Sequence, residues 1–110
     1  TDNTTYGILA NNAASIDILL NGTVVSGATI VIRAQRDGTS NQDFTVQRSA
    51  DDVTYTQSAT YTSTSTTTNF NYVITGNTRY IRITSASNNN NRDIRIYRDS
   101  STLPSKQLKH

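Results

Sequence analysis

The sequence predicts an all-β domain, specifically an eight-stranded antiparallel β-sandwich with jelly-roll topology. Three observations support this prediction. Apolar residues recur at every second position through most of the 110-residue chain, as expected of strands with one buried and one solvated face. Turn-forming pairs such as Asn21-Gly22 and Asp37-Gly38 separate these segments. The abundant residues Thr, Ile, Val and Tyr favour strands, and no segment has the pattern of a helix.

Four alternating segments occupy the first half of the chain, and turn-forming residues follow each of them. In the second segment Ile16 and Ile18 share the core face with Leu20. In the fourth segment Phe44 and Val46 are expected in the core. The four predicted strands are residues 5–10, 15–20, 28–35 and 43–49.

Four further segments follow in the second half. In the seventh segment Ile81 and Ile83 are expected to face the core, while Tyr80 and Arg82 face outward. Residues 62–68, rich in Thr and Ser, are expected as a loop or a ragged continuation of the fifth strand. One face of that fifth strand is predicted to hold Val53, Tyr55, Gln57, Ala59 and Tyr61. The four predicted strands are residues 53–61, 70–75, 79–84 and 93–97.

The jelly-roll order pairs the first, eighth, third and sixth segments in one sheet, and the second, seventh, fourth and fifth in the other. Residues 69–99 then contribute strands to both sheets and join the two halves of the core. The length suits a single domain, which is predicted to span residues 1–99. Residues 100–110 contain the chain's Pro and its His and lack alternation, so they are expected to be a linker or a disordered tail.

Charge and hydropathy argue against two classes of partner. The chain has ten basic and eight acidic residues. Two of the basic residues, Lys106 and Lys109, lie near the C-terminus, so the rest of the chain has no net charge. A balanced surface does not suit nucleic acid, and no apolar run is long enough to insert into a bilayer. The chain begins at Thr1 rather than at Met, and we expect it to be a mature or excised piece of a longer precursor.

The residue types that catalysis requires are sparse in this sequence. His110 lies at the terminus of a polar segment, where a catalytic triad or a His-containing metal site is not expected. The adjacent Asp51 and Asp52 lie in a predicted turn, where carboxylates usually accept hydrogen bonds from backbone amides. The chain is therefore predicted not to be an enzyme.

An Asn-rich loop at residues 85–93 is the first candidate ligand site. In the jelly-roll order it lies at the same end of the sandwich as the loops at residues 36–41 and 62–68. Amide, hydroxyl, carboxylate and guanidinium groups offer the paired donors and acceptors that sugar hydroxyls need. A solvated loop without a ligand is the alternative interpretation. The candidate binding residues at this end are Asn11, Asn12, Arg36, Asp37, Asn41, Asn88, Asn89, Asn90 and Arg92.

The same end of the sandwich carries carboxylates that could bind a Ca²⁺ ion. Asp37, Asp43 or Asp93 could act together with Asn and backbone oxygens, because Ca²⁺ prefers oxygen ligands. The sequence contains no diagnostic calcium-binding spacing, so no cofactor is predicted as a requirement.

The outward face of a sheet is the second candidate ligand site. Tyr80 and Arg82 on this face could stack on a sugar or a protein and donate hydrogen bonds to it. Ordinary cross-strand pairs that stabilise the sheet are the alternative. The expected neighbours of these two residues are Asp17, Thr45 and Gln47, and on the opposite sheet Arg33 is expected beside Arg95 and Tyr97.

Three stretches of the sequence resemble a known group of modules. FTVQRSADDVTYT at residues 44–56 resembles the F-x-V-x-x-S-x-D-x-x-x-Y/W hairpin of discoidin-like and carbohydrate-binding jelly-roll domains. TRYIRITSAS at residues 78–87, followed by NRDIRIY at residues 91–97, is similar to their ARYIRI strand pair. SIDILLNGTVVSGATIVIRAQ at residues 15–35 resembles the opening of secreted repeat modules of gliding and marine Bacteroidetes.

The resemblance covers roughly residues 5–99 and implies a jelly-roll fold. It also implies a role as a glycan binder, as a spacer beside an enzyme or as a unit of a surface adhesin. The chain departs from the glycan-binding members because it has no Trp, which is a common sugar-stacking residue among them.

The predicted function is that of a non-catalytic module, secreted or at the cell surface, that binds carbohydrate or mediates adhesion as part of a larger polypeptide. Its expected partner is a glycan or a cell-surface polymer. The alternative is a structural repeat or subunit of a filament, appendage or virion that contacts copies of itself, which uncovered sheet edges would permit.

Overall fold

The computed structural model describes residues 5–9, 15–36, 41–85, 94–97 and 108–109, and these residues form strands and turns without a helix. The predicted all-β class is therefore confirmed. No helix in the described part of the chain is long and apolar enough to cross a membrane. The strands are β1 (Thr5–Leu9), β2 (Ser15–Val24), β3 (Thr29–Arg36), β4 (Gln42–Ser49), β5 (Thr56–Ser63), β6 (Thr68–Val73), β7 (Thr78–Ser85), β8 (Ile94–Tyr97) and β9 (Leu108–Lys109).

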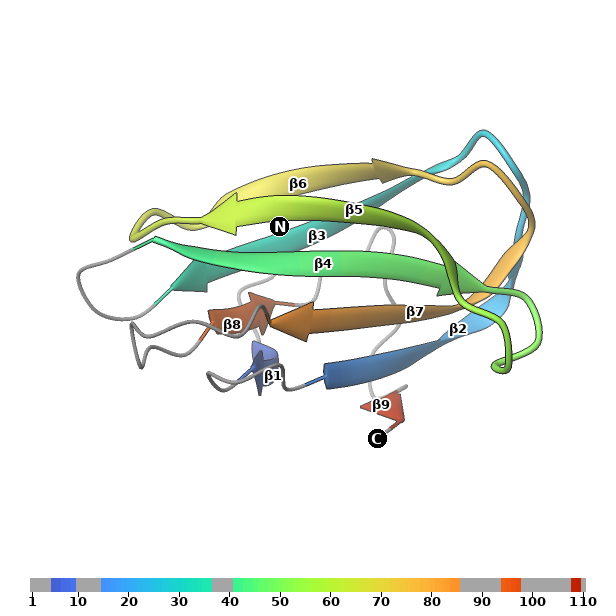
Figure 1. The fold of residues 1–110 in the computed structure, drawn as a ribbon, viewed down its shortest axis with the longest axis horizontal. Helices are drawn as coiled ribbons and strands as arrows, with labels where there is room; N and C mark the ends of the chain where they lie inside the picture. Colours follow the sequence, from blue (N-terminus) through green and yellow to red (C-terminus); the bar gives the residue numbers. More distant parts are fainter. Residues whose placement is uncertain (1–4, 10–14, 37–40, 86–93, 98–107, 110) are drawn as a thin grey trace.

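The strands form two antiparallel sheets that pack face to face (Figure 1). One sheet has four strands in the order β1-β8-β3-β6. The other has five strands in the order β5-β4-β7-β2-β9 and lies in front in Figure 1. Strand β7 has β2 and β4 as its neighbours, and it therefore lies well inside the five-stranded sheet.

The core lies between the two sheets and is built from alternate residues of the strands. The predicted inward side chains Ile81 and Ile83 of β7 are completely buried. They lie opposite Ile18 and Ile16 of β2 in the strand register. The remaining core residues are Leu20, Ile30, Ile32, Ala34, Phe44, Val46, Tyr72, Ile74, Ile94 and Ile96. Burial of this many large apolar side chains is the main favourable term in folding.

The predicted turn at Asn21-Gly22 is wrong, because both residues lie within β2. The pairing of β2 with β7 is irregular between Leu19 and Val24, and Asn21 and Gly22 are exposed there. The chain reverses instead before β3, where Gly27 has a φ of 95°, a conformation that residues with a Cβ rarely adopt.

The predicted face of the fifth strand is confirmed for Ala59 and Tyr61 and wrong for Tyr55. Ala59 and Tyr61 pack against the core, but β5 begins at Thr56, and the pairing of β5 with β4 shifts near its start. Gln57 lies at this shift with a φ of 58°. A β-bulge with a left-handed residue interrupts the alternation of side chains, so Tyr55 leaves the face that Ala59 and Tyr61 occupy.

Strands β5 and β6 are the terminal strands of the two sheets on one side of the sandwich. Side chains join them across the gap between the sheets. Tyr61 of β5 donates a hydrogen bond to the carbonyl oxygen of Asn71 at 2.9 Å, and Gln57 donates one to that of Val73 at 2.6 Å. Tyr72 of β6 donates in the opposite direction to the carbonyl oxygen of Gln57 at 2.8 Å. These bonds occupy backbone acceptors that an edge strand could otherwise offer to another chain.

Within the predicted tail, residues 100–110, the structure describes Leu108 and Lys109, which form β9. These two residues pair with Ile18 and Asp17 of β2. Strand β9 therefore extends the five-stranded sheet beyond β2, at the edge opposite β5.

Candidate functional site

Most residues of the first candidate site lie outside the described part of the chain. Among them are most of the side chains expected to bind a sugar and two of the three carboxylates expected to bind Ca²⁺. These residues are Asn11, Asn12, Asp37, Asn88, Asn89, Asn90, Arg92 and Asp93.

The described residues at that end of the sandwich show how β3 meets the loop between β5 and β6. The amide of Arg36 donates to the carbonyl oxygen of Thr64 at 2.9 Å. Gln35 donates to the carbonyl oxygen of Ser65 at 2.7 Å and accepts a hydrogen bond from Thr67 at 3.0 Å. The end of β3 and residues 64–67 are thus adjacent, as predicted. Of the other residues predicted there, Asn41 is exposed, and Asp43 accepts a hydrogen bond from Thr62.

The outward face of the five-stranded sheet carries a more completely described group of side chains. Asp17 of β2, Arg82 of β7 and Gln47 of β4 lie side by side across three strands. The predicted position of Arg82 beside Asp17 and Gln47 is therefore confirmed. The pairing follows from the alternation in β7, since burial of Ile81 and Ile83 turns Arg82 outward.

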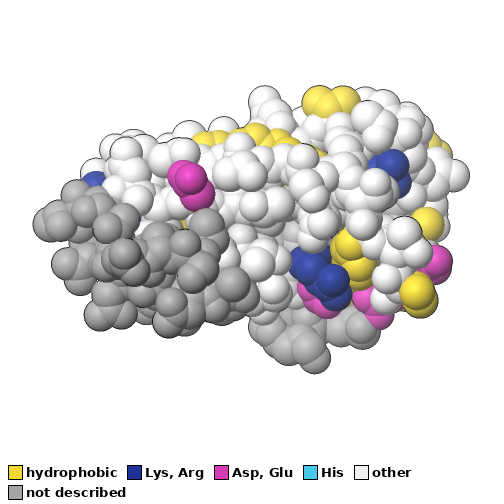
Figure 2. Space-filling view, in the orientation of Figure 1, with side chains coloured by type: hydrophobic (Ala, Val, Ile, Leu, Met, Phe, Trp, Pro, Cys, Tyr) yellow, Lys and Arg dark blue, Asp and Glu magenta, His cyan; other side chains and the backbone are white. Residues whose placement is uncertain are grey.

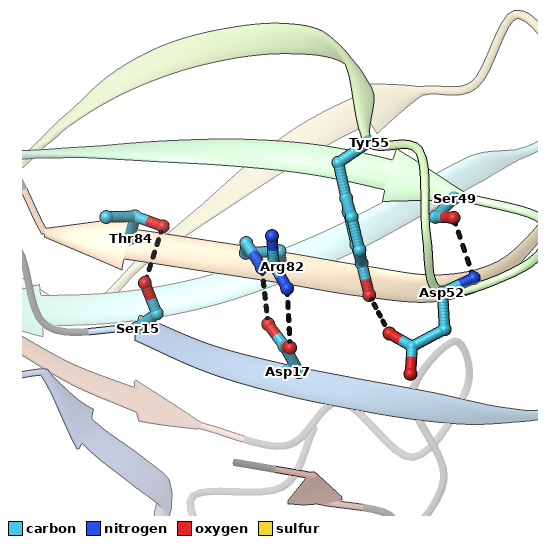
Figure 3. Close-up of polar contacts among 7 residues, drawn as sticks. All are labelled: Ser15, Asp17, Ser49, Asp52, Tyr55, Arg82 and Thr84. Carbon is cyan, nitrogen blue, oxygen red and sulfur yellow. Dashed lines mark hydrogen bonds and ion pairs between the residues drawn. The ribbon is translucent and has the colours of Figure 1, made fainter.

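Arg82 and Asp17 form a two-point ion pair (Figure 3). Nε and Nη2 of Arg82 donate to Oδ1 and Oδ2 of Asp17 at 2.8 and 2.9 Å. The Asp17 side chain is 12% exposed and that of Arg82 is 35% exposed. This bidentate geometry fixes the plane of the guanidinium group. The hydrogen bonds to Asp17 also raise the pKa of Arg82 above its usual value, so the side chain stays charged.

Tyr55 covers one side of this guanidinium group. The Cζ atom of Arg82 lies 3.8 Å from the centroid of the Tyr55 ring, a cation–π arrangement. The hydroxyl of Tyr55 donates to Oδ1 of Asp52 at 2.6 Å. We call the four residues Asp17, Asp52, Tyr55 and Arg82 the Arg82 cluster.

The loop between β4 and β5 holds Tyr55 in place through its own hydrogen bonds. Oγ of Ser49 accepts from the amides of Asp51 and Asp52 at 3.2 and 2.9 Å. Oδ1 of Asp51 accepts from the amides of Val53 and Thr54 at 2.9 and 3.0 Å, so the predicted capping role of this carboxylate is confirmed. The amides of Thr54 and Val53, followed by the Ser49 hydroxyl, lower the pKa of Asp51 below its usual value.

Two residues with left-handed backbone lie on either side of Tyr55. Asp52 has a φ of 64° and Gln57 a φ of 58°. A non-glycine residue in this region is uncommon, and Gln is less often found there than Asp. The bulge at Gln57 redirects the chain so that Tyr55 contacts Arg82 on the outward face instead of entering the core.

A ladder of polar pairs continues this face across β4 and β5. Asp43 and Thr62, Thr45 and Thr60, and Gln47 and Ser58 each form a side-chain hydrogen bond, with distances of 2.7, 3.2 and 3.0 Å. Ser15 and Thr84 form a similar pair at 2.9 Å between β2 and β7. Figure 2 shows the molecule in the orientation of Figure 1. Charged side chains are few on this face, and most of its described surface belongs to uncharged polar groups and backbone.

Tyr80 does not join the Arg82 cluster. It lies opposite Leu19 and Ser49 in the strand register and is half-buried. On the opposite sheet Arg33 lies beside Tyr97, as predicted, and donates a hydrogen bond to Asn69 at 3.0 Å. Arg95 lies opposite Gln35.

The charged and aromatic groups of the Arg82 cluster are paired with one another. The described residues contain no group of three or more His, Cys, Asp or Glu side chains placed to hold a metal ion. Burial, followed by the hydrogen bond to Asp52, raises the pKa of Tyr55 above its usual value. The phenol is therefore neutral at physiological pH and acts as a hydrogen-bond donor.

The chain has no counterpart in three comparisons with known proteins: no protein-family model, no curated protein and no solved structure matches it.

Proposed function

We propose that this domain is a non-catalytic module of jelly-roll type that binds carbohydrate or mediates adhesion, and that it acts in a secreted or surface-attached polypeptide. The strand order supports the jelly-roll assignment, since β1-β8-β3-β6 and β5-β4-β7-β2 are the pairings expected for that topology. The resemblance of residues 44–56 and 78–97 to discoidin-like and carbohydrate-binding modules agrees with it.

The single observation that supports the binding role is the outward face of the five-stranded sheet. Hydroxyl, amide and guanidinium groups there are held in place by cross-strand hydrogen bonds, and an aromatic ring stands beside them. Sugars present hydroxyl groups that both donate and accept, together with apolar C–H surface, and such a mixed face is complementary to them. Because the side chains are already fixed, binding orders few of them.

Native affinity gels that contain polysaccharides, together with a glycan array, test the proposed function. We expect the purified domain to be retarded by at least one polysaccharide relative to a gel without it. If no polysaccharide retards the domain and no glycan on the array retains it, the proposed function is wrong.

The alternative role in a self-assembling structure requires contacts between copies of this chain. The hydrogen bonds from Tyr61 and Gln57 already occupy the carbonyl oxygens of Asn71 and Val73 on β6. These bonds count against assembly through that sheet edge. Light scattering over a wide concentration range separates the two roles, because the binding module is expected to stay monomeric while a structural subunit forms oligomers.

A further inference from the structure

We infer that the ligand site lies on the outward face of the five-stranded sheet, around Arg82, and that it takes an uncharged saccharide. This inference rests on the proposed function and specifies its site and its ligand class. Of the two sites expected from the sequence, it favours the outward sheet face over the loops at the end of the sandwich, with Tyr55 in place of Tyr80 beside Arg82.

Arg82 and Gln47 carry polar groups that are fixed in place but still able to bind a ligand. Arg82 uses Nε and Nη2 for Asp17, and Figure 3 shows its third nitrogen directed away from that carboxylate. Within the described part of the chain, this third nitrogen, Nη1, donates no hydrogen bond. On the neighbouring strand, Gln47 donates to Ser58 through Nε2, and its Oε1 accepts no hydrogen bond from a described residue. A donor and an acceptor therefore lie on adjacent strands with their orientations set.

Tyr55 supplies the aromatic ring of the inferred site. Tyr55 leaves the core-facing alternation of β5 because of the bulge at Gln57, and its ring then stacks on Arg82. A sugar-binding site commonly combines such a ring with a few convergent polar groups. Strained backbone on either side of a residue is a reason to ask whether that residue has a function, and Asp52 and Gln57 supply such backbone here.

The charged groups around Arg82 select among saccharides. The Arg82 cluster contains two carboxylates, Asp17 and Asp52, and one guanidinium group, and Lys109 of β9 lies opposite Asp17 in the strand register. Asp17 already neutralises Arg82 through both of its oxygens. Uronates, sulfated sugars and sialic acids are disfavoured, because the two-nitrogen edge of Arg82 that would bind their anionic groups is occupied by Asp17, and this ion pair would have to break. Hydroxyl groups of an uncharged saccharide match the donor on Arg82 and the acceptor on Gln47 without that penalty.

The test uses affinity gels with neutral polysaccharides (mannan, galactan and β-glucan) and with anionic ones (alginate, pectate and sulfated galactan), at a salt concentration of about 0.15 M to screen exposed charges. Gln47→Ala and Tyr55→Ala remove an acceptor and the ring from the inferred site. Asn69→Ala is the matched control, since Asn69 forms a similar exposed pair with Arg33 on the opposite sheet. Circular dichroism confirms that each variant is folded, and Gln47→Ala serves alone if Tyr55→Ala does not fold.

We expect retardation by a neutral polysaccharide, weakened about fivefold to tenfold by Gln47→Ala, the effect of losing one hydrogen bond of 1 to 1.4 kcal/mol. The control is expected to bind like the parent domain. Binding that Asn89→Ala or Arg92→Ala abolishes, and that Gln47→Ala and Tyr55→Ala leave unchanged, would overturn the inferred site while the proposed function stands. Retardation by anionic polysaccharides alone would overturn the ligand class. If no polysaccharide retards the domain, the proposed function and the site fail together.

Discussion

The guanidinium group of Arg82 is held between two side chains, since Asp17 binds its edge through two hydrogen bonds and the Tyr55 ring lies 3.8 Å from its Cζ atom. The arrangement joins the loop between β4 and β5 to the centre of the five-stranded sheet. Asp17, Arg82 and Tyr55 belong to segments that are far apart in the sequence. The contact is therefore long-range, and its formation requires the sheet to be complete.

Tyr55→Phe is expected to destabilise the domain by about 1 to 2 kcal/mol, because the hydroxyl loses its 2.6 Å hydrogen bond to the Asp52 carboxylate. Tyr55→Ala also removes the stacking on Arg82, and it should cost about 0.5 to 1 kcal/mol more for the cation–π contact, plus the lost burial of the ring. Urea unfolding followed by circular dichroism measures both variants. Equal stabilities of the two variants would show that the ring contact contributes nothing.

The alternation of apolar residues was enough to predict the core of the sandwich. Ile81 and Ile83 are completely buried and Arg82 faces outward beside Asp17, because a strand places successive side chains on opposite faces. The turn at Asp51-Asp52 was also predictable, since short carboxylate side chains accept hydrogen bonds from nearby amides.

The position of Tyr55 was not predictable from the same pattern. Its place depends on the left-handed backbone of Gln57, and Gln carries no sequence signal for that conformation, whereas Gly or Asn would have suggested it. Alternation continued through the bulge therefore placed Tyr55 on the same face as Ala59 and Tyr61. The partners that stabilise Gln57, among them Thr75 and Val73, lie on distant segments, and such contacts cannot be inferred from local patterns.

Asp51 is expected to make stability depend on pH in the acid range. Its pKa is lowered by hydrogen bonds from the amides of Thr54 and Val53, so the folded state favours the carboxylate. The stabilisation is complete above the unfolded pKa of about 4 and is lost as the pH falls through the lower folded value.

Asp51→Asn keeps an acceptor oxygen for these amides but cannot titrate. Thermal unfolding between about pH 2 and pH 5 should therefore show a shallower loss of stability for this variant than for the parent domain. Parallel stability curves of the two proteins would contradict the prediction.

Tyr72 is expected to make stability depend on pH in the alkaline range. Burial raises the pKa of Tyr72 to about 12, so the folded state favours the neutral phenol. The stabilisation of the folded state by this neutral phenol is complete below the unfolded pKa of about 10, and it is lost as the pH rises towards the folded pKa. The loss amounts to roughly 2 to 3 kcal/mol, from two pKa units at 1.36 kcal/mol each.

Tyr72→Phe cannot ionise, so its stability should fall less steeply than that of the parent domain between about pH 10 and pH 12. At neutral pH the variant should be less stable by about 1 kcal/mol, because the hydroxyl no longer donates to the carbonyl oxygen of Gln57. Urea unfolding at each pH gives both quantities. An identical alkaline slope in the two proteins would assign the pH dependence to other groups.

Gln57 gives the most specific prediction, because its backbone and its side chain act in opposite directions on stability. The φ of 58° is unfavourable for a residue with a Cβ. Its side-chain oxygen accepts from Arg48 and twice from Thr75, and its amide donates to Val73, four hydrogen bonds between 2.6 and 2.8 Å. Gln57→Ala loses these bonds and keeps the strained backbone, so we expect a destabilisation of about 2 to 4 kcal/mol.

Gln57→Gly loses the same hydrogen bonds but relieves the backbone strain, so it should be about 1 kcal/mol more stable than Gln57→Ala. This order reverses the usual one, since Gly within a strand is normally less stable than Ala by about 0.5 to 1 kcal/mol. Urea unfolding of the two variants under identical conditions measures the difference. A more stable Gln57→Ala would show that the left-handed bulge does not persist once the hydrogen bonds are removed, and Tyr55 would then lose the geometry that places it on Arg82.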